Sequence, residues 1–156
     1  VYKRQESFQE TFLELFGGGK AQLELEDEND ILSCGIEIKV QPPGKALKII
    51  SLLSGGEKAF VAIALYFAIL KVHPTPFCIM DEIEAALDEA NVVRTARYMR
   101  TLADKTQFIV ITHRRGTMEA ADVLYGVTMQ EQGVSKLLEL RASEVEEKLG
   151  LKLQQS

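Results

Sequence analysis

The sequence predicts an α/β fold with a mainly parallel sheet flanked by helices. Two short apolar runs, 77–80 and 108–111, have the length and composition of strands. A helical stretch from about Glu89 to Ala103 lies between them. Strands that are apolar throughout and joined through a helix are typical of a parallel sheet buried on both faces. No repeat, low-complexity tract or linker divides the chain, so we expect one domain over residues 1–156.

The segment before this unit predicts a helix followed by an antiparallel pair of strands. A helix is expected over 2–16, because its apolar residues recur at spacings of three and four: Phe8, Phe12, Leu15 and Phe16. Three glycines at 17–19 end that helix. Apolar and polar residues then alternate, with an acidic loop at 27–30 between two groups of apolar residues: Leu23 and Leu25, then Ile36, Ile38 and Val40. Pro42-Pro43-Gly44 ends the second strand.

The remaining elements follow from the same reasoning. Residues 55–72 are almost continuously apolar, which predicts a helix buried on most sides. Residues 123–129 and 134–140 flank Glu131-Gln132-Gly133 and predict a second antiparallel hairpin. Ser143 to Glu146 has the S-x-x-E pattern of a capping box, which predicts a short terminal helix.

Composition excludes several classes of protein. The chain has 18 Lys plus Arg against 23 Asp plus Glu, a net charge of −5, so it is not a simple basic clamp on DNA phosphates. Any contact with nucleic acid must then be local or supplied elsewhere. No apolar run approaches the roughly 20 residues of a membrane-spanning helix. Cys34 and Cys78 lack metal-ligand spacing and fit a reducing compartment.

The first candidate site is the start of the helix at 55–72. Ser54 and Glu57 form a capping box, while Gly55 and Gly56 allow a ligand to approach the backbone closely. Free N–H groups at a helix start carry about half a positive charge, which suits a phosphate. The same residues could equally form only a well-capped core helix.

The second candidate site combines acids and an imidazole at the ends of two predicted strands. Asp81 and Glu82 follow the first apolar run, and His113 follows the second. Ligands of open parallel sheets collect at the carboxyl ends of the strands. One carboxylate there can hold Mg²⁺ on a nucleotide, its neighbour can polarise a water, and the imidazole can reach a terminal phosphate. Taken singly, the acids could merely begin a helix and the histidine could be structural.

A phosphate-binding loop of the form G-x-x-x-x-G-K-[ST] is missing from the chain. Its two Gly-Lys pairs, Gly19-Lys20 and Gly44-Lys45, are each followed by Ala, and no glycine stands five residues before either. The sequence therefore contains candidate residues for metal binding and water activation but no loop of the kind that binds a nucleotide triphosphate.

Four motifs in order resemble those of ATP-binding-cassette ATPases. They are the signature LSGGEK at 53–58, the Walker B segment at 77–82, the D-loop Ala86-Leu87-Asp88, and the switch histidine in Ile111-Thr112-His113. Longer stretches resemble one branch of that superfamily, the bacterial SMC proteins or condensins: 16–19, 41–45, 81–92, 116–119 and 125–129. This resemblance runs from about residue 8 to residue 140.

The resemblance implies the C-terminal lobe of a split ATPase head, whose Walker A motif lies in a separate N-terminal half. It implies a coiled-coil root at 1–16, the lobe at 17–140 and a tail at 141–156. A chain of this kind is one piece of a head and is expected to be inactive alone. The implied activity of the whole head is ATP hydrolysis with ATP and Mg²⁺, driving chromosome condensation and segregation.

The resemblance also assigns roles. Asp81 would hold Mg²⁺ through the nucleotide, Glu82 would polarise the attacking water, and His113 would sense the terminal phosphate. Asp88 would lie at the seam between two heads. Ser54, Gly55 and Gly56 would contact ATP held by the opposite head, with Glu57 and Lys58 in the same motif but with less defined contacts.

The implied partners are the N-terminal half of the same head, a second SMC head in an ATP-bound homodimer, DNA through the full complex, and a kleisin. The kleisin's C-terminal winged-helix domain would bind the outer face, with the segment from Val134 onward as the candidate surface. The location would be cytoplasmic, at the nucleoid, with no membrane contact. Two alternatives remain: another ABC-type ATPase of DNA repair or transport, or a non-catalytic kleisin-docking module.

Overall fold

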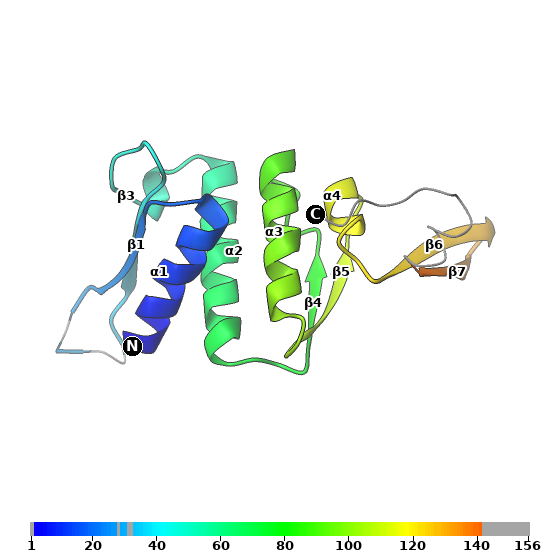
Figure 1. The fold of residues 1–156 in the computed structure, drawn as a ribbon, viewed down its shortest axis with the longest axis horizontal. Helices are drawn as coiled ribbons and strands as arrows, with labels where there is room; N and C mark the ends of the chain where they lie inside the picture. Colours follow the sequence, from blue (N-terminus) through cyan, green and yellow to red (C-terminus); the bar gives the residue numbers. More distant parts are fainter. Residues whose placement is uncertain (1, 28, 31–32, 142–156) are drawn as a thin grey trace.

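The computed structural model describes residues 2–27, 29–30 and 33–141. The elements in chain order are α1 (Tyr2–Phe16), β1 (Lys20–Leu25), β2 (Ile36–Gln41), β3 (Lys48–Ile49), a 3₁₀ turn (Ile50–Leu52), α2 (Gly55–Val72), β4 (Phe77–Asp81), α3 (Glu89–Leu102), β5 (Gln107–Ile111), α4 (Arg115–Met118), β6 (Val123–Glu131) and β7 (Val134–Arg141). The strands form three separate sheets, ordered β1-β2-β3, β4-β5 and β6-β7. Figure 1 shows them spread along the molecule, with α1, α2 and α3 side by side between the first and the second. No described helix is long and apolar enough to cross a membrane.

Helix α1 confirms the predicted apolar stripe. Phe8, Phe12 and Leu15 are fully buried in the core. The ring of Phe12 stacks on that of Phe16 with centroids 4.0 Å apart. The helix ends at three glycines with positive φ, and at Gly19 a Cβ atom would overlap the carbonyl oxygen of Gln41. The glycine run is therefore required both to turn the chain and to bring it against β2.

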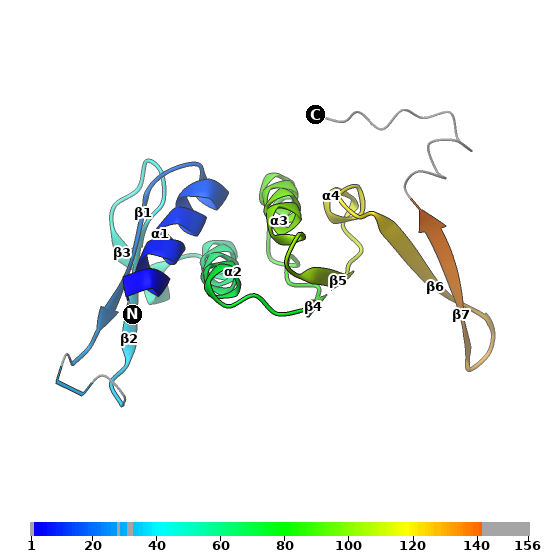
Figure 2. The same cartoon turned by 60° about the horizontal axis from the view of Figure 1, so that its bottom comes forward.

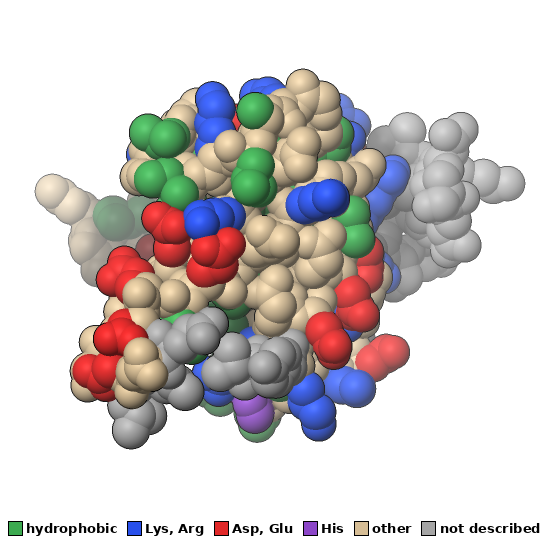
Figure 3. Space-filling model, turned by 90° about the vertical axis from the view of Figure 1, so that its left-hand side faces the viewer, with side chains coloured by type: hydrophobic (Ala, Val, Ile, Leu, Met, Phe, Trp, Pro, Cys, Tyr) green, Lys and Arg blue, Asp and Glu red, His purple; other side chains and the backbone are tan. Residues whose placement is uncertain are grey.

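The antiparallel pair β1-β2 is confirmed, and the short strand β3 extends it on the far edge of β2. Ala21 and Val40 pair across the strands and turn into the core. The opposite side, facing the viewer in Figure 3, carries acidic and basic side chains next to one another. Lys39 lies there with its ammonium 2.6 Å from Glu24 and 3.2 Å from Glu37. Alternation along the strands thus separates a buried from a charged face.

Helix α2 is central, although the prediction that it is buried on most sides is only partly correct. Phe60, Val61, Ala64 and Phe67 lie in the core with α1 and α3. Tyr66 and Ile69 are each 45% exposed. An apolar sequence shows that a face tolerates burial, but whether it is covered depends on which elements are present.

The parallel pair β4-β5 is confirmed, with Asp81 paired to Ile111 at its carboxyl end. Burial on both faces is wrong for this chain, since exposure alternates along β4. Cys78 and Met80 face the core shared with α2 and α3, while the other face is uncovered in the part of the chain that the structure describes. That open face consists of Phe77, Ile79, Ile109 and Ile111. The prediction of a mainly parallel sheet is also wrong, because the other two sheets are antiparallel.

The predicted second hairpin is confirmed as β6-β7, with an irregularity between Met129 and Glu131. It projects from the helices, as Figures 1 and 2 both show. Apolar side chains on both strands are exposed, among them Tyr125, Val127, Met129, Leu137 and Leu140. The helix predicted from Ser143 lies outside the described residues.

Candidate functional site

The functional candidates gather at one edge of the fold. The N-terminal ends of α2 and α3 and the carboxyl ends of β4 and β5 point to the same edge in Figure 1. The backbone N–H of Glu82 donates to the carbonyl oxygen of Ile111 over 3.0 Å, which ties the segment after β4 to the last residue of β5. This edge is where an open parallel sheet binds its ligands.

Glu82 and His113 are brought together as their positions after two parallel strands predict. The Glu82 Oε1 and His113 Nδ1 atoms are 3.3 Å apart, and both side chains are more than half exposed. Glu82 has φ 46°, the only positive value at a non-glycine among the described residues. Strain of this kind is found mainly where the position of a side chain matters. The two side chains are therefore placed so that a group entering from solvent could be oriented between a carboxylate and an imidazole.

Asp81 is the last residue of β4 and is exposed at the same edge. Among the described residues, no three His, Cys, Asp or Glu side chains come together as a metal site. Asp81 can thus supply one oxygen ligand of the kind Mg²⁺ prefers, while a nucleotide's phosphates and waters would supply the others. The residues present fit a magnesium ion that arrives with a nucleotide.

The start of α2 has the predicted capping box. Ser54 accepts a hydrogen bond from the Glu57 N–H, and the Glu57 carboxylate accepts from the Ser54 N–H. The same carboxylate accepts from the ammonium of Lys45 over 2.7 Å. These hydrogen bonds, led by that from Lys45, lower the pKa of Glu57 to about 2. The Glu57 carboxylate is therefore engaged by hydrogen bonds within the chain.

The two glycines of this helix start have different environments. A Cβ atom at Gly56 would lie 3.0 Å from the carbonyl oxygen of Ala86, so Gly56 allows α2 to pack on the turn before α3. At Gly55 a Cβ atom would meet nothing within 4 Å. Gly56 therefore serves internal packing as well as lining the cleft, and the close approach of a ligand predicted for both glycines stays a prediction.

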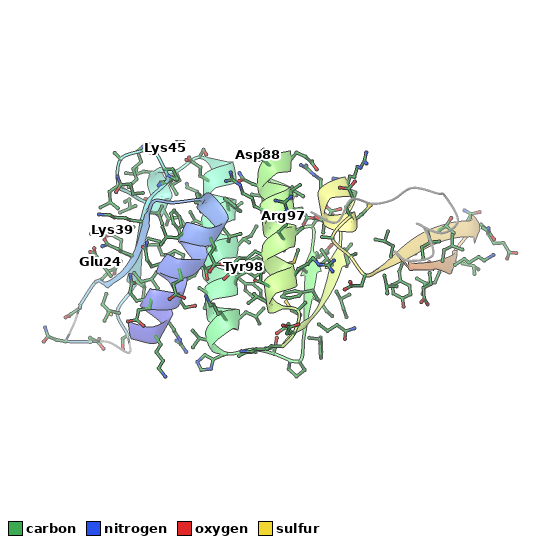
Figure 4. The ribbon with its side chains drawn as sticks, viewed as in Figure 1. Glu24, Lys39, Lys45, Asp88, Arg97 and Tyr98 are labelled. Carbon is green, nitrogen blue, oxygen red and sulfur yellow. The ribbon has the colours of Figure 1, made fainter. Side chains whose placement is uncertain are left out.

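A cleft of about 410 Å³ joins the start of α2 to the start of α3. Ser54, Gly56 and Asp88 line it, which places these predicted residues together. Asp88 is the N-cap of α3 and accepts from the Asn91 N–H over 2.8 Å. Figure 4 shows Lys45 and Asp88 at the same edge of the molecule. Asp81, Glu82 and His113 do not line this cleft, so the chain presents two separate groups of candidates.

Sequence reasoning missed several residues of this region. Lys45 and Arg94 bring positive charge into the lining of the cleft. Lys45 belongs to a failed phosphate-loop match and to the stretch at 41–45 that resembles SMC proteins, neither of which gives it a role, and Arg94 lies within a helix where a charged residue is ordinary. Neither had a local signal, because Lys45 reaches the cleft from the segment between β2 and β3 and Arg94 reaches it from α3.

Glu84 is a further residue that was missed. Its side chain is buried in the turn between β4 and α3, with 2% of its surface exposed. Its Oε1 atom accepts hydrogen bonds from the hydroxyls of Thr112 and Thr117. No signal in the sequence indicated this, because buried acids are rare and Glu84 lies in an acidic run that is expected to be exposed. The turn after β4 and the segment after β5 are thereby joined through a buried carboxylate.

Comparison with known proteins identifies the family. A model of the "RecF/RecN/SMC N terminal domain" matches residues 13–136. The Chromosome partition protein Smc of Bacillus subtilis (strain 168) is 62% identical over 140 residues, 90% of this chain. That of Desulfitobacterium hafniense (strain Y51) is 61% identical over 136 residues, 87% of this chain. The chain belongs to the SMC family.

Solved SMC heads have the same fold. A structure of the SmcHead bound to the C-winged helix domain of ScpA superposes with a TM-score of 0.85 at 44% identity, over 94% of this chain and 44% of that one. A chain from work on ATP-driven dimerization of SMC ATPases gives 0.83 at 42% identity, over 98% of this chain and 94% of that one. This chain spans 12% of the Bacillus relative and 11% of the Desulfitobacterium one. It is therefore an SMC head fragment by sequence and by fold.

Proposed function

We propose that this chain is the C-terminal lobe of a bacterial SMC ATPase head and that it supplies the water-activating and head-engaging residues for ATP hydrolysis. The observation that carries the proposal is the contact between Glu82 and His113 at the carboxyl ends of β4 and β5. A second group, Ser54, Gly56 and Asp88, lies around the separate cleft, and Gly55 lies between the first two in the sequence. Two half-sites without a triphosphate cradle are what one lobe of a two-headed ATPase would contribute.

Each residue has a role that its environment supports. Glu82, exposed and beside His113, would accept a proton from an attacking water, and His113 would donate to a terminal phosphate. Asp81 would hold Mg²⁺, which neutralises charge on the phosphates when bound. The open helix start at Gly55 would receive the nucleotide of the opposite head, and Asp88 would lie at the seam.

The uncovered face of β4-β5 supports a missing lobe as a partner. Phe77 and Ile79 on β4 and Ile109 and Ile111 on β5 are each 45–61% exposed on one face. Exposed apolar patches of this kind mark contact surfaces. In the ScpA-bound head this chain corresponds to only 44% of the solved chain, so more than half of that head lies outside the matched region. The N-terminal half would cover the apolar face.

Three further assignments complete the proposal. Helix α1 would be the root of the coiled coil, and β7, from Val134 onward, would take part in binding a kleisin's winged-helix domain. The ScpA-bound relative supports this partner. DNA would be contacted through the full complex, at the nucleoid in the cytoplasm, with chromosome condensation and segregation as the outcome.

The test is Glu82→Gln in the head reassembled from both halves. Glutamine keeps the shape and an acceptor oxygen but cannot take a proton, so turnover should fall on the order of a hundredfold or more. ATP-dependent dimerisation, measured by size-exclusion chromatography, should persist. Glu119→Gln is the matched control, because Glu119 is an exposed carboxylate paired with Arg115 on the surface. A loss of turnover no larger than that of the control would refute the role of Glu82, and a reassembled head without ATPase activity would favour a docking module.

A further inference from the structure

The buried carboxylate of Glu84 connects the two segments that carry the proposed catalytic residues. The Thr117 hydroxyl donates to its Oε1 atom over 3.0 Å, and the Thr112 hydroxyl donates to the same atom. Thr112 in turn accepts a hydrogen bond from the Arg114 N–H over 3.0 Å. Both hydroxyls flank His113 in the sequence, while Glu84 lies two residues after Glu82. The network thus spans the gap between β4 and β5 beneath the exposed pair.

We propose that Glu84 is a positioning residue, which holds the loop 112–117, and through it His113, in register with Glu82. This inference rests on the proposed function, since it assigns a role to Glu84 in the same reaction. Glu84 is shielded from solvent and lies below the surface that a nucleotide would reach. It therefore acts through the loop and not by contact with substrate.

The chemistry of the buried group argues against a packing role alone. The second carboxylate oxygen, Oε2, is buried and has no hydrogen-bond partner among the described residues. An unpaired buried oxygen is costly, and an apolar side chain would fill the same space without that cost. What the carboxylate provides is one oxygen that accepts from two hydroxyls at once, which fixes the position of the loop relative to the turn.

The loop has a second attachment that does not involve Glu84. The Arg114 guanidinium donates to the carbonyl oxygen of Leu87 over 3.2 Å and to the Glu89 carboxylate over 3.1 Å. The loop should therefore remain on the fold when the Glu84 network is broken. Its attachment becomes looser, and the distance between Glu82 and His113 is no longer fixed.

The first test observes His113 directly and needs no enzymatic activity. The chain has two histidines, so the imidazole NMR resonances of His73 serve as an internal reference. Thr117→Val, which removes one hydroxyl from Glu84, should shift and broaden the His113 resonances and leave those of His73 in place. Thr95→Val is the matched control, because Thr95 is also buried and donates only within α3, to the Asn91 carbonyl oxygen. Unchanged His113 resonances in Thr117→Val would overturn the proposal.

The second test measures turnover in the head reassembled from both halves. Glu84→Ala should lower kcat on the order of 10- to 100-fold, the range for a displaced catalytic group, with the KM for ATP and ATP-dependent dimerisation unchanged. Glu84→Gln keeps an accepting oxygen and should restore kcat to within about threefold of wild type, well inside that range. Equal kcat for Glu84→Ala and wild type, or parallel losses of kcat and dimerisation, would overturn the positioning role.

A double-mutant cycle separates this inference from the proposed function. If Glu84 acts through His113, adding Glu84→Ala to His113→Ala should cause no further loss of kcat. Full additivity of the two losses would overturn the inference while leaving a role for His113. Conversely, full turnover in His113→Ala would remove His113 from the proposed function, and the positioning role in catalysis would fail with it, whatever the resonances show.

Discussion

Replacing Gly55 or Gly56, the two glycines at the start of α2, by alanine distinguishes a role in internal packing from a role in admitting a ligand. At Gly56 the new Cβ would press on the Ala86 carbonyl oxygen at 3.0 Å, whereas at Gly55 it would meet nothing within 4 Å. Overpacking costs about 1–3 kcal/mol, and replacing a helical glycine by alanine returns about 0.5–1 kcal/mol. We expect Gly56→Ala to lose about 1 kcal/mol of unfolding free energy. Gly55→Ala should lose none and should gain up to about 1 kcal/mol.

Urea unfolding of the two variants measures these free energies, and thermal melting should show a difference of about 2–4 °C per kcal/mol for a chain of this size. In the reassembled head, Gly55→Ala should nevertheless prevent ATP-driven dimerisation, because its methyl group would project into the open space at the helix start, where we propose that the nucleotide of the opposite head binds. Equal unfolding free energies for the two variants would refute the packing argument. A wild-type dimer peak for Gly55→Ala would refute the argument from access.

Three further predictions concern the same edge. The chain alone should neither hydrolyse ATP nor bind it with micromolar affinity in a calorimetric titration, because no G-x-x-x-x-G-K-[ST] loop holds the phosphates. Ser54→Arg is tested in heads that also carry Glu82→Gln to stop turnover; it should leave nucleotide binding intact and abolish the ATP-dependent dimer. If Ser54 were only a helix cap, its loss would instead cost about 0.5–2 kcal/mol of stability and dimerisation would be normal. Hydrogen bonds from Lys45 and from Ser54 lower the pKa of Glu57 from 4.5 to about 2, so their contribution to stability is present above pH 4.5 and lost as the pH falls through 2. Lys45→Met should accordingly reduce the unfolding free energy at pH 7 by less than about 1 kcal/mol, as for other exposed pairs, and this loss should disappear as the pH falls below the folded-state pKa of Glu57.

The elements themselves were predictable where one physical signal determined them. The spacing of Phe8, Phe12 and Leu15 predicted the buried stripe of α1, and the apolar runs predicted β4 and β5. The exposure of one face of β4-β5 was not predictable from the sequence. An apolar strand has the same sequence pattern whether its second face packs against the same chain or against another one. Ile79 and Ile109 are exposed in the described part of the chain, and no local sequence pattern encodes that exposure.

The candidate site likewise has features that the sequence predicted and features that it did not. The contact between Glu82 and His113 followed from strand order, since the carboxyl ends of parallel neighbours meet at one edge. The capping box followed from spacing alone. The burial of Glu84 and the positions of Lys45 and Arg94 depend on how the turn before α3 packs on α2 and on the loop after β5. These are properties of tertiary packing, and sequence periodicity does not report them.

The aromatic contact at the end of α1 has a mechanical consequence. The ring of Phe16, the last residue of α1, lies with its centroid 4.5 Å from that of Phe60 on α2, and both side chains line the cleft beside Ser54. The Ser7 hydroxyl donates to the carbonyl oxygen of Ala68 further along the same pair of helices. Because close-packed interiors transmit strain, we expect a change in the direction of α1 to move the Phe16–Phe60 contact and with it this wall of the cleft.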